Sequence, residues 1–274
     1  MADLSHLSTL QKAQLSVFKE FIKICDRHGL TYYITGGTLL GSVRHKGFIP
    51  WDDDIDVLMT RKDYEKFLKC ATELPSSMYL SNFDTPGHVW LVPRVIDRTT
   101  KFYLNNSMAK KEIGAWIDIL IVDGIPNRGT LQFYLFKYKY LFARMLYQFS
   151  NFSTAVNVNL EGRPWYENIA IKFAQYTHIE KLLNPVRCGN FYDRICKRYD
   201  LDKCELCAPL SGSMKWREVI DKKWVGKGLQ YPFEDIMVIG VDEADKYLTY
   251  IFGDYMTPPP INDRNRHNVT KVED

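Results

Sequence analysis

Hydrophobic residues in the first half of the chain recur with helical and strand spacings in alternation. Apolar positions between residues 7 and 28 follow a helical period, and Gly29 stands where such a helix would end. Shorter apolar runs separated by turn residues read as strands. The predicted helices cover residues 7–28, 38–45 (capped by Thr38) and 63–70, and the predicted strands residues 32–34, 55–59, 89–92, 95–97 and 116–122. This order indicates an α/β or α+β core over residues 1–126. Of the two we expect the α+β class, with a mixed sheet.

The second half of the chain has a different pattern. Long helical periods predict a mainly helical region over residues 127–260, packed on the core and helping to form the substrate site. Residues 261–274 form a polar tail. The predicted helices of this half cover residues 131–149, 165–183, 188–199 and 241–252, the last ended by Gly253.

Composition narrows the classes of protein that fit. The chain has 274 residues, 46% hydrophobic and 25% charged, which is ordinary for a globular protein. A net charge of +3 is too small to indicate nucleic-acid binding, so we expect no nucleic-acid partner. No run approaches the roughly 20 apolar residues of a membrane-spanning helix, and the N-terminus does not resemble a secretory signal. We therefore expect a cytoplasmic protein.

Acidic residues on the predicted strands are the main candidates for chemistry. Side chains on a strand alternate between its faces, so Asp54 and Asp56 share one face. Two converging carboxylates repel and favour a cation between them, and Mg²⁺ or Mn²⁺ suits an oxygen-only site. Asp118, a lone acid in an apolar strand, is expected to be the third catalytic, metal-binding acid rather than half of a structural ion pair. Asp123-Gly124 is expected to be a turn.

A glycine pair precedes these acids. Gly36 and Gly37 allow close approach of an anion, and the N-terminus of the following helix favours negative charge. We expect Gly36, Gly37 and Thr38, together with Arg44, to bind the phosphates of a donor substrate. His45 fits a role beside them or a surface position equally well.

Residues 36–57, from the glycine pair to Val57, resemble the signature of the LicD family of phosphotransferases. The similarity continues through residues 116–119 and 123–126 and returns at residues 247–256. The resemblance implies a nucleotidyltransferase-like fold, with Asp54, Asp56 and Asp118 as metal ligands. Members of the family, which is related to fukutin-type ribitol-phosphate transferases, move phosphocholine, ribitol phosphate or a similar group. Their donor is a CDP-linked alcohol, their acceptor is a glycan or lipid-linked glycan, and CMP is released.

Other readings remain open at this stage. They are a nucleotidyltransferase that uses an NTP, a metal-dependent glycosyltransferase, and a non-catalytic partner in glycan assembly. A zinc site on Cys188, Cys196, Cys204 and Cys207 is disfavoured against free thiols, because their spacing does not suit a compact site. The aromatic helix at 131–149 fits a core helix slightly better than one that contacts the inner face of a membrane.

Overall fold

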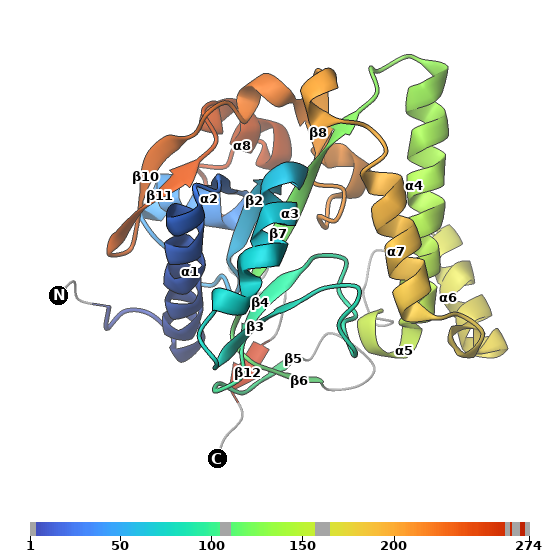
Figure 1. The fold of residues 1–274 in the computed structure, drawn as a ribbon, viewed down its shortest axis with the longest axis horizontal. Coiled ribbons are helices and arrows are strands. Elements are labelled where there is room, and N and C mark those ends of the chain that lie inside the picture. Colours follow the sequence, from blue (N-terminus) through green and yellow to red (C-terminus); the bar gives the residue numbers. More distant parts are fainter. Residues whose placement is uncertain (1–3, 105–110, 157–164, 261–263, 265–268, 272–274) are drawn as a thin grey trace.

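A sheet of nine strands forms the centre of the protein (Figure 1). The computed structural model describes residues 4–104, 111–156, 165–260, 264 and 269–271. Two neighbouring pairs, β1 with β11 and β2 with β7, are parallel, and the other pairs are antiparallel. Along the sheet the order is β10 (Leu229–Phe233), β11 (Ile236–Gly240), β1 (Tyr32–Ile34), β2 (Asp56–Thr60), β7 (Trp116–Ile125), β4 (Arg94–Asp97) and β3 (Met78–Ser81), and β8 (Leu206–Ala208) joins β7 to β9 (Ile220–Asp221). The expected α+β fold with a mixed sheet is confirmed.

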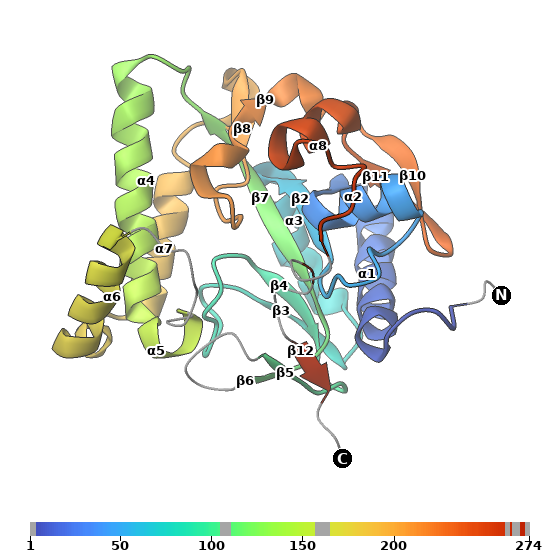
Figure 2. The ribbon, with the colours of Figure 1, turned by 180° about the vertical axis from the view of Figure 1, so that it is seen from behind.

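Helices cover both faces of this sheet. Helices α1 (Thr9–His28) and α3 (Arg61–Cys70) lie on one face in Figure 1, and α2 (Gly36–His45) and α8 (Ala244–Phe252) lie on the other in Figure 2. The ends of α1 are set by its sequence. Ser8 and Gln11 form a capping box, and Gly29 takes the left-handed conformation that ends the helix, as predicted.

Four further helices gather at one end of the sheet. They are α4 (Leu131–Ser150), α5 (Phe152–Ala155), α6 (Trp165–Thr177) and α7 (Pro185–Cys196). Phe136 and Tyr140 of α4 are buried with Tyr192 of α7 in a second apolar cluster beside the sheet. A small sheet is formed by β12 (Val269–Lys271), β5 (Phe102–Leu104) and β6 (Lys111–Ile113), so part of the polar tail pairs with the core. Residues 261–263, 265–268 and 272–274 lie outside the described residues.

Strand β7 is buried at all ten positions, as expected for the central strand of a sheet covered on both faces. It continues through Asp123 and Gly124, where Asp123 pairs with Ala208 of β8. The turn predicted there is therefore wrong. Asp123 is an interior residue whose carboxylate accepts hydrogen bonds of 2.9 and 2.6 Å from Arg61 at the start of α3.

The strand predicted at residues 89–92 is absent from the structure, where this segment is an irregular loop. Pro86 and Pro93 flank it and cannot donate to a ladder. The hairpin of β10 and β11 was not predicted, because Pro232 interrupts its first strand. Strand β10 lies at the edge of the sheet, where a proline is tolerated.

The division of the chain into residues 1–126 and 127–260 stays a prediction. Four strands of the second region, β8 to β11, join the central sheet.

Candidate metal and phosphate site

Two neighbouring strands bring the predicted acids together, and a third strand adds an arginine. In the sheet register Asp56 of β2 pairs with Asp118 of β7, which pairs with Arg94 of β4. Paired residues project from the same face, so these three side chains lie in a row. Asp54 precedes β2, and carboxylate oxygens of Asp54, Asp56 and Asp118 lie within 4.8 Å of one another. The structure therefore brings the three predicted acids together, while their metal-binding and catalytic roles stay predictions.

Arg94 holds Asp118 in place. Its Nε and Nη2 donate to the two carboxylate oxygens of Asp118 over 2.5 and 3.0 Å. The guanidinium lies between two indole rings, 4.4 Å from the centre of Trp90 and 4.9 Å from that of Trp116. Its third nitrogen, Nη1, is buried and has no hydrogen-bond partner within the described residues. The irregular loop at 89–92 therefore supplies one wall of the site.

Negative charge accumulates around Asp56. Burial raises its pKa well above the usual range, and the nearby charges of Asp54, Asp118, Asp52 and Glu218 raise it further. A divalent cation among these oxygens would reverse that effect. An all-carboxylate set fits Mg²⁺ or Mn²⁺ better than a metal that prefers sulfur or imidazole. Asp54, Asp56 and Asp118 therefore fit the cation that the sequence predicted.

The glycine pair lies against these acids. Helix α2 begins at Gly36 rather than at residue 38, and Thr38 does not cap it. The Thr38 hydroxyl instead accepts a 2.8 Å hydrogen bond from the backbone N–H of Asp56, which joins the first turn of α2 to the start of β2. The predicted cap at Thr38 is wrong because the helix begins two residues earlier, at Gly36. Gly36 has a left-handed backbone conformation, which glycine adopts readily.

Space around the two glycines is limited. A Cβ at Gly36 would lie 3.1 Å from Oδ2 of Asp56, and one at Gly37 would lie 2.6 Å from Oδ2 of Asp52. The first peptide N–H groups of α2 are therefore close to the carboxylates. A phosphate bound by these N–H groups would also be within reach of a cation on the acids.

Arg44 lies in the last turn of α2, at the end opposite the glycines. Its Nη1 donates to the backbone carbonyl of Tyr255 over 2.6 Å, and its guanidinium lies 6.0 Å from the ring centre of Trp51. The guanidinium of Arg264 also lies over the Trp51 ring, 4.1 Å from its centre. Burial and then the charge of Arg44 lower the pKa of His45. Phosphate binding by Arg44 stays a prediction, as does the role of His45.

Four residues near the site were not predicted from the sequence. Arg94 follows a proline and starts a short apolar strand, and a lone arginine in such a strand could have indicated a buried partner. The hydroxyls of Tyr247 and Thr35 lie 2.7 Å apart just before α2. Burial raises the pKa of Glu218 to about 8, partly opposed by Arg144, and Oε2 of Glu218 has no hydrogen-bond partner in the described part of the chain.

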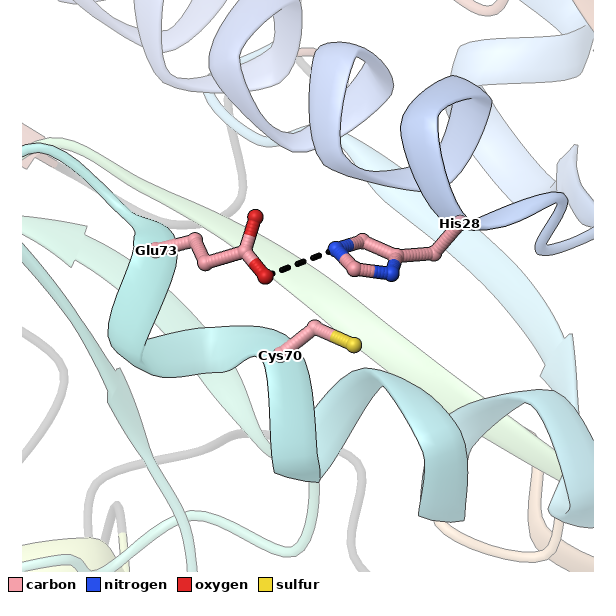
Figure 3. Close-up of side chains that lie close together, drawn as sticks. All are labelled: His28, Cys70 and Glu73. Carbon is pink, nitrogen blue, oxygen red and sulfur yellow. Dashed lines mark hydrogen bonds and ion pairs between the residues drawn. The ribbon is translucent and has the colours of Figure 1, made fainter.

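A second group of ligand-type side chains lies away from the sheet acids. His28, Cys70 and Glu73 join the end of α1 to the end of α3 (Figure 3). Glu73 is already paired: His28 Nε2 lies 2.8 Å from one of its oxygens, and Arg27 donates to the other over 2.7 Å. We interpret this group as an ion-pair contact between the two helices.

The four cysteines considered for zinc are free thiols in this structure. Cys196 and Cys207 are buried, and Cys204 packs against Gly124. Among the described residues, none of the four belongs to a group of three ligand side chains close enough to share an ion. The expectation that the chain holds no zinc there stays a prediction.

Comparison with known proteins adds to this geometry. Residues 29–154 match the family described as "LicD/FKTN/FKRP, nucleotidyltransferase domain". The lipopolysaccharide cholinephosphotransferase LicD of Haemophilus influenzae is 27% identical over 274 residues, which cover 96% of this chain and 97% of that protein. The uncharacterized protein RP689 of Rickettsia prowazekii is 28% identical over 137 residues, 47% of this chain and 48% of that protein. The matched region contains the three acids, the glycine pair and Arg94, so the part of the chain that carries the candidate site is similar to the nucleotidyltransferase domain of the LicD family.

Proposed function

We propose that this protein transfers a phospho-alcohol, such as phosphocholine or ribitol phosphate, from a CDP-linked donor to a hydroxyl group of a glycan, with release of CMP. The observation that carries the proposal is the convergence of Asp54, Asp56 and Asp118 beside the N-terminus of α2. Carboxylates that hold a cation, next to peptide N–H groups that bind phosphate, suit a diphosphate substrate. The relative from Haemophilus influenzae is named for cholinephosphate transfer to lipopolysaccharide, which supports a glycan acceptor.

In this proposal Asp54, Asp56 and Asp118 hold Mg²⁺ or Mn²⁺. The cation supplies neutralisation of the charge on the phosphate oxygens. The first turn of α2 binds the diphosphate and orients it against the acids. Arg94 occupies both oxygens of Asp118, which favours a metal-binding role for Asp118 over that of a proton acceptor.

The reaction forms one bond and breaks one. The acceptor hydroxyl oxygen forms a bond to the phosphorus that carries the alcohol. The bond from that phosphorus to the bridging oxygen breaks, and its electron pair leaves with CMP. The hydroxyl proton passes to solvent or to a nearby base. As part of the proposal we place the reaction in the cytoplasm, as the sequence led us to expect.

The test is CMP release by the purified protein from a panel of CDP-alcohols, including CDP-choline and CDP-ribitol, with an extracted glycan as acceptor. We expect CMP from at least one donor with Mg²⁺ or Mn²⁺ and none after chelation by EDTA. The Asp56→Asn protein is the control for contaminating phosphodiesterases. CMP formation that persists with EDTA, or equally in the Asp56→Asn protein, would refute the proposal.

A further inference from the structure

Helix α4 has two apolar sides, and only one of them is buried. Phe133, Phe136, Tyr140, Ala143 and Tyr147 face the interior. A second set, spaced by four, three, four and three residues, follows the outer side of the same helix. Its members are exposed to solvent: Leu131, Leu135, Tyr138, Phe142 and Met145. Tyr138 and Phe142 keep 66% and 52% of their surface accessible. The core position expected for this helix is therefore correct for one side and leaves the other side unexplained.

Helix α6 carries a similar exposed stripe. It lies beside the lower half of α4 in both views of the molecule (Figures 1 and 2). Its exposed apolar residues also follow helical spacing, and Tyr176 keeps 89% of its surface accessible. They are Trp165, Ile169, Phe173 and Tyr176. We call the exposed apolar residues of α4 and α6 together the outer face. Monomeric soluble proteins rarely expose so many large apolar side chains in one region.

The same region carries the positive charge of the chain. Residues 127–190 contain eight Lys and Arg against three Asp and Glu, whereas the whole chain has 36 against 33. The rest of the protein is therefore slightly acidic. Helix α4 contains no acidic residue, and Lys139 of α4 and Lys172 of α6 are exposed. Of the two acids in this region that the structure describes, Glu167 pairs with Lys215 and Glu180 accepts the backbone N–H of Ser153.

We propose that the outer face binds the surface of a lipid bilayer that contains anionic headgroups. Trp, Tyr and Phe side chains favour the boundary between water and acyl chains, and lysines beside them reach the anionic headgroups. A second copy of the chain is a poorer occupant, because it would bring the exposed lysines of two identical surfaces, such as Lys139 and Lys172, close together. No helix in the described part of the chain is long and apolar enough to cross a membrane. The contact that we propose lies along the membrane surface.

This contact has a consequence that rests on the proposed function. A glycan attached to a lipid would be held at the same surface as the catalytic sheet. The bound protein would then meet its acceptor by diffusion along the membrane. The contact itself does not depend on the reaction, so it can be tested without an activity assay.

The test is flotation of the full-length protein with vesicles of phosphatidylcholine alone and of phosphatidylcholine with phosphatidylglycerol. We expect binding to the anionic vesicles that weakens when salt rises from about 0.1 M to about 0.5 M. The Tyr138→Asp/Phe142→Asp protein should bind at least about tenfold more weakly, because it loses apolar contact and adds negative charge. The matched control is Leu229→Asp/Met237→Asp, which changes two equally exposed apolar residues of the β10–β11 hairpin and should bind like the unmodified protein.

A second variant protects the test against misfolding. Lys139→Glu/Lys172→Glu leaves the apolar residues intact, and it should also lose binding to anionic vesicles by about tenfold or more. Failure of the unmodified protein to float, or an equal loss in the hairpin control, would overturn the proposal. Light scattering gives the remaining outcome. A dimer that Tyr138→Asp/Phe142→Asp converts to monomer would assign the outer face to self-association instead.

Discussion

Asp56 is a buried acid with four other carboxyl groups close enough to influence it. Burial and the charges of Asp54, Asp118, Asp52 and Glu218 all raise its pKa. Asp56→Asn removes part of this repulsion, so the metal-free variant should melt no earlier than the unmodified protein. It should also lose at least about a hundredfold in turnover, because a cation ligand is missing. Melting curves with and without Mn²⁺, and CMP release, measure both effects. Near-normal turnover in a folded variant would contradict the metal site.

Asp118 has two roles that substitutions can separate. Asp118→Asn leaves the buried charge of Arg94 without its partner, which should cost about 3 kcal/mol of stability and abolish turnover. Arg94→Met breaks the same pair but keeps the carboxylate. We expect a similar loss of stability in both metal-free variants, with Mn²⁺ raising the melting temperature of Arg94→Met only. If Mn²⁺ stabilises both variants equally, Asp118 is not a ligand.

Glu218 gives the stability of the protein a dependence on pH. Burial raises its pKa from 4.5 to about 8 in the folded protein, above the value in the unfolded chain. Its contribution to stability is therefore complete below about pH 4.5 and is lost as the pH rises through about 8. Glu218→Gln should flatten the fall in stability over this window. The exposed Glu65→Gln on α3 serves as the control, and an identical pH profile for all three proteins would show that Glu218 does not titrate in this way.

At the level of elements, the junction of α2 with β2 positions the site. Gly36 adopts a positive φ of 53° beside Asp56, and Gly29 adopts one of 60° with no atom within 4 Å of its missing Cβ. Alanine at either position should cost about 1–2 kcal/mol from backbone strain alone. We expect only Gly36→Ala to weaken Mn²⁺ binding and turnover, because its methyl group meets the carboxylate of Asp56.

Calorimetric titration with Mn²⁺, together with chemical unfolding, separates strain from crowding in this pair. The Gly29→Ala protein provides the cost of strain at a helix end far from the acids. Equal losses of Mn²⁺ affinity in the two variants would mean that the close approach at Gly36 has no part in binding.

Elements that depend on neighbouring residues were predictable from the sequence. The period of α1, the strand of Tyr32–Ile34 and the long helix α4 follow from local patterns, and alternation along the chain placed Asp54 and Asp56 on one side. Contacts between distant segments were not predictable in this way. One example is the strand register that pairs Arg94 with Asp118. Another is the position of Glu218, which is far from Asp56 in the sequence but close enough in the fold to raise its pKa.

In the whole molecule, the acids and the outer face lie on different parts of one chain. The sheet holds the three carboxylates at its centre, and α4 and α6 form one end of the molecule (Figure 1). We propose that the site formed by the acids on the sheet transfers the phospho-alcohol and not the nucleotide. The absence of a Gly-Lys-Ser/Thr phosphate loop in the sequence agrees with a diphosphate donor.

The most direct measurement follows the phosphorus atoms of the donor. CDP-choline, or whichever CDP-alcohol proves active, is labelled with radioactive phosphorus in the phosphate attached to the alcohol and incubated with the protein, Mg²⁺ and the acceptor glycan. The account predicts that the label moves to the glycan, that unlabelled CMP appears in equal amount, and that no pyrophosphate forms from CTP. Pyrophosphate released from CTP, with the nucleotide joined to its acceptor, would contradict the account.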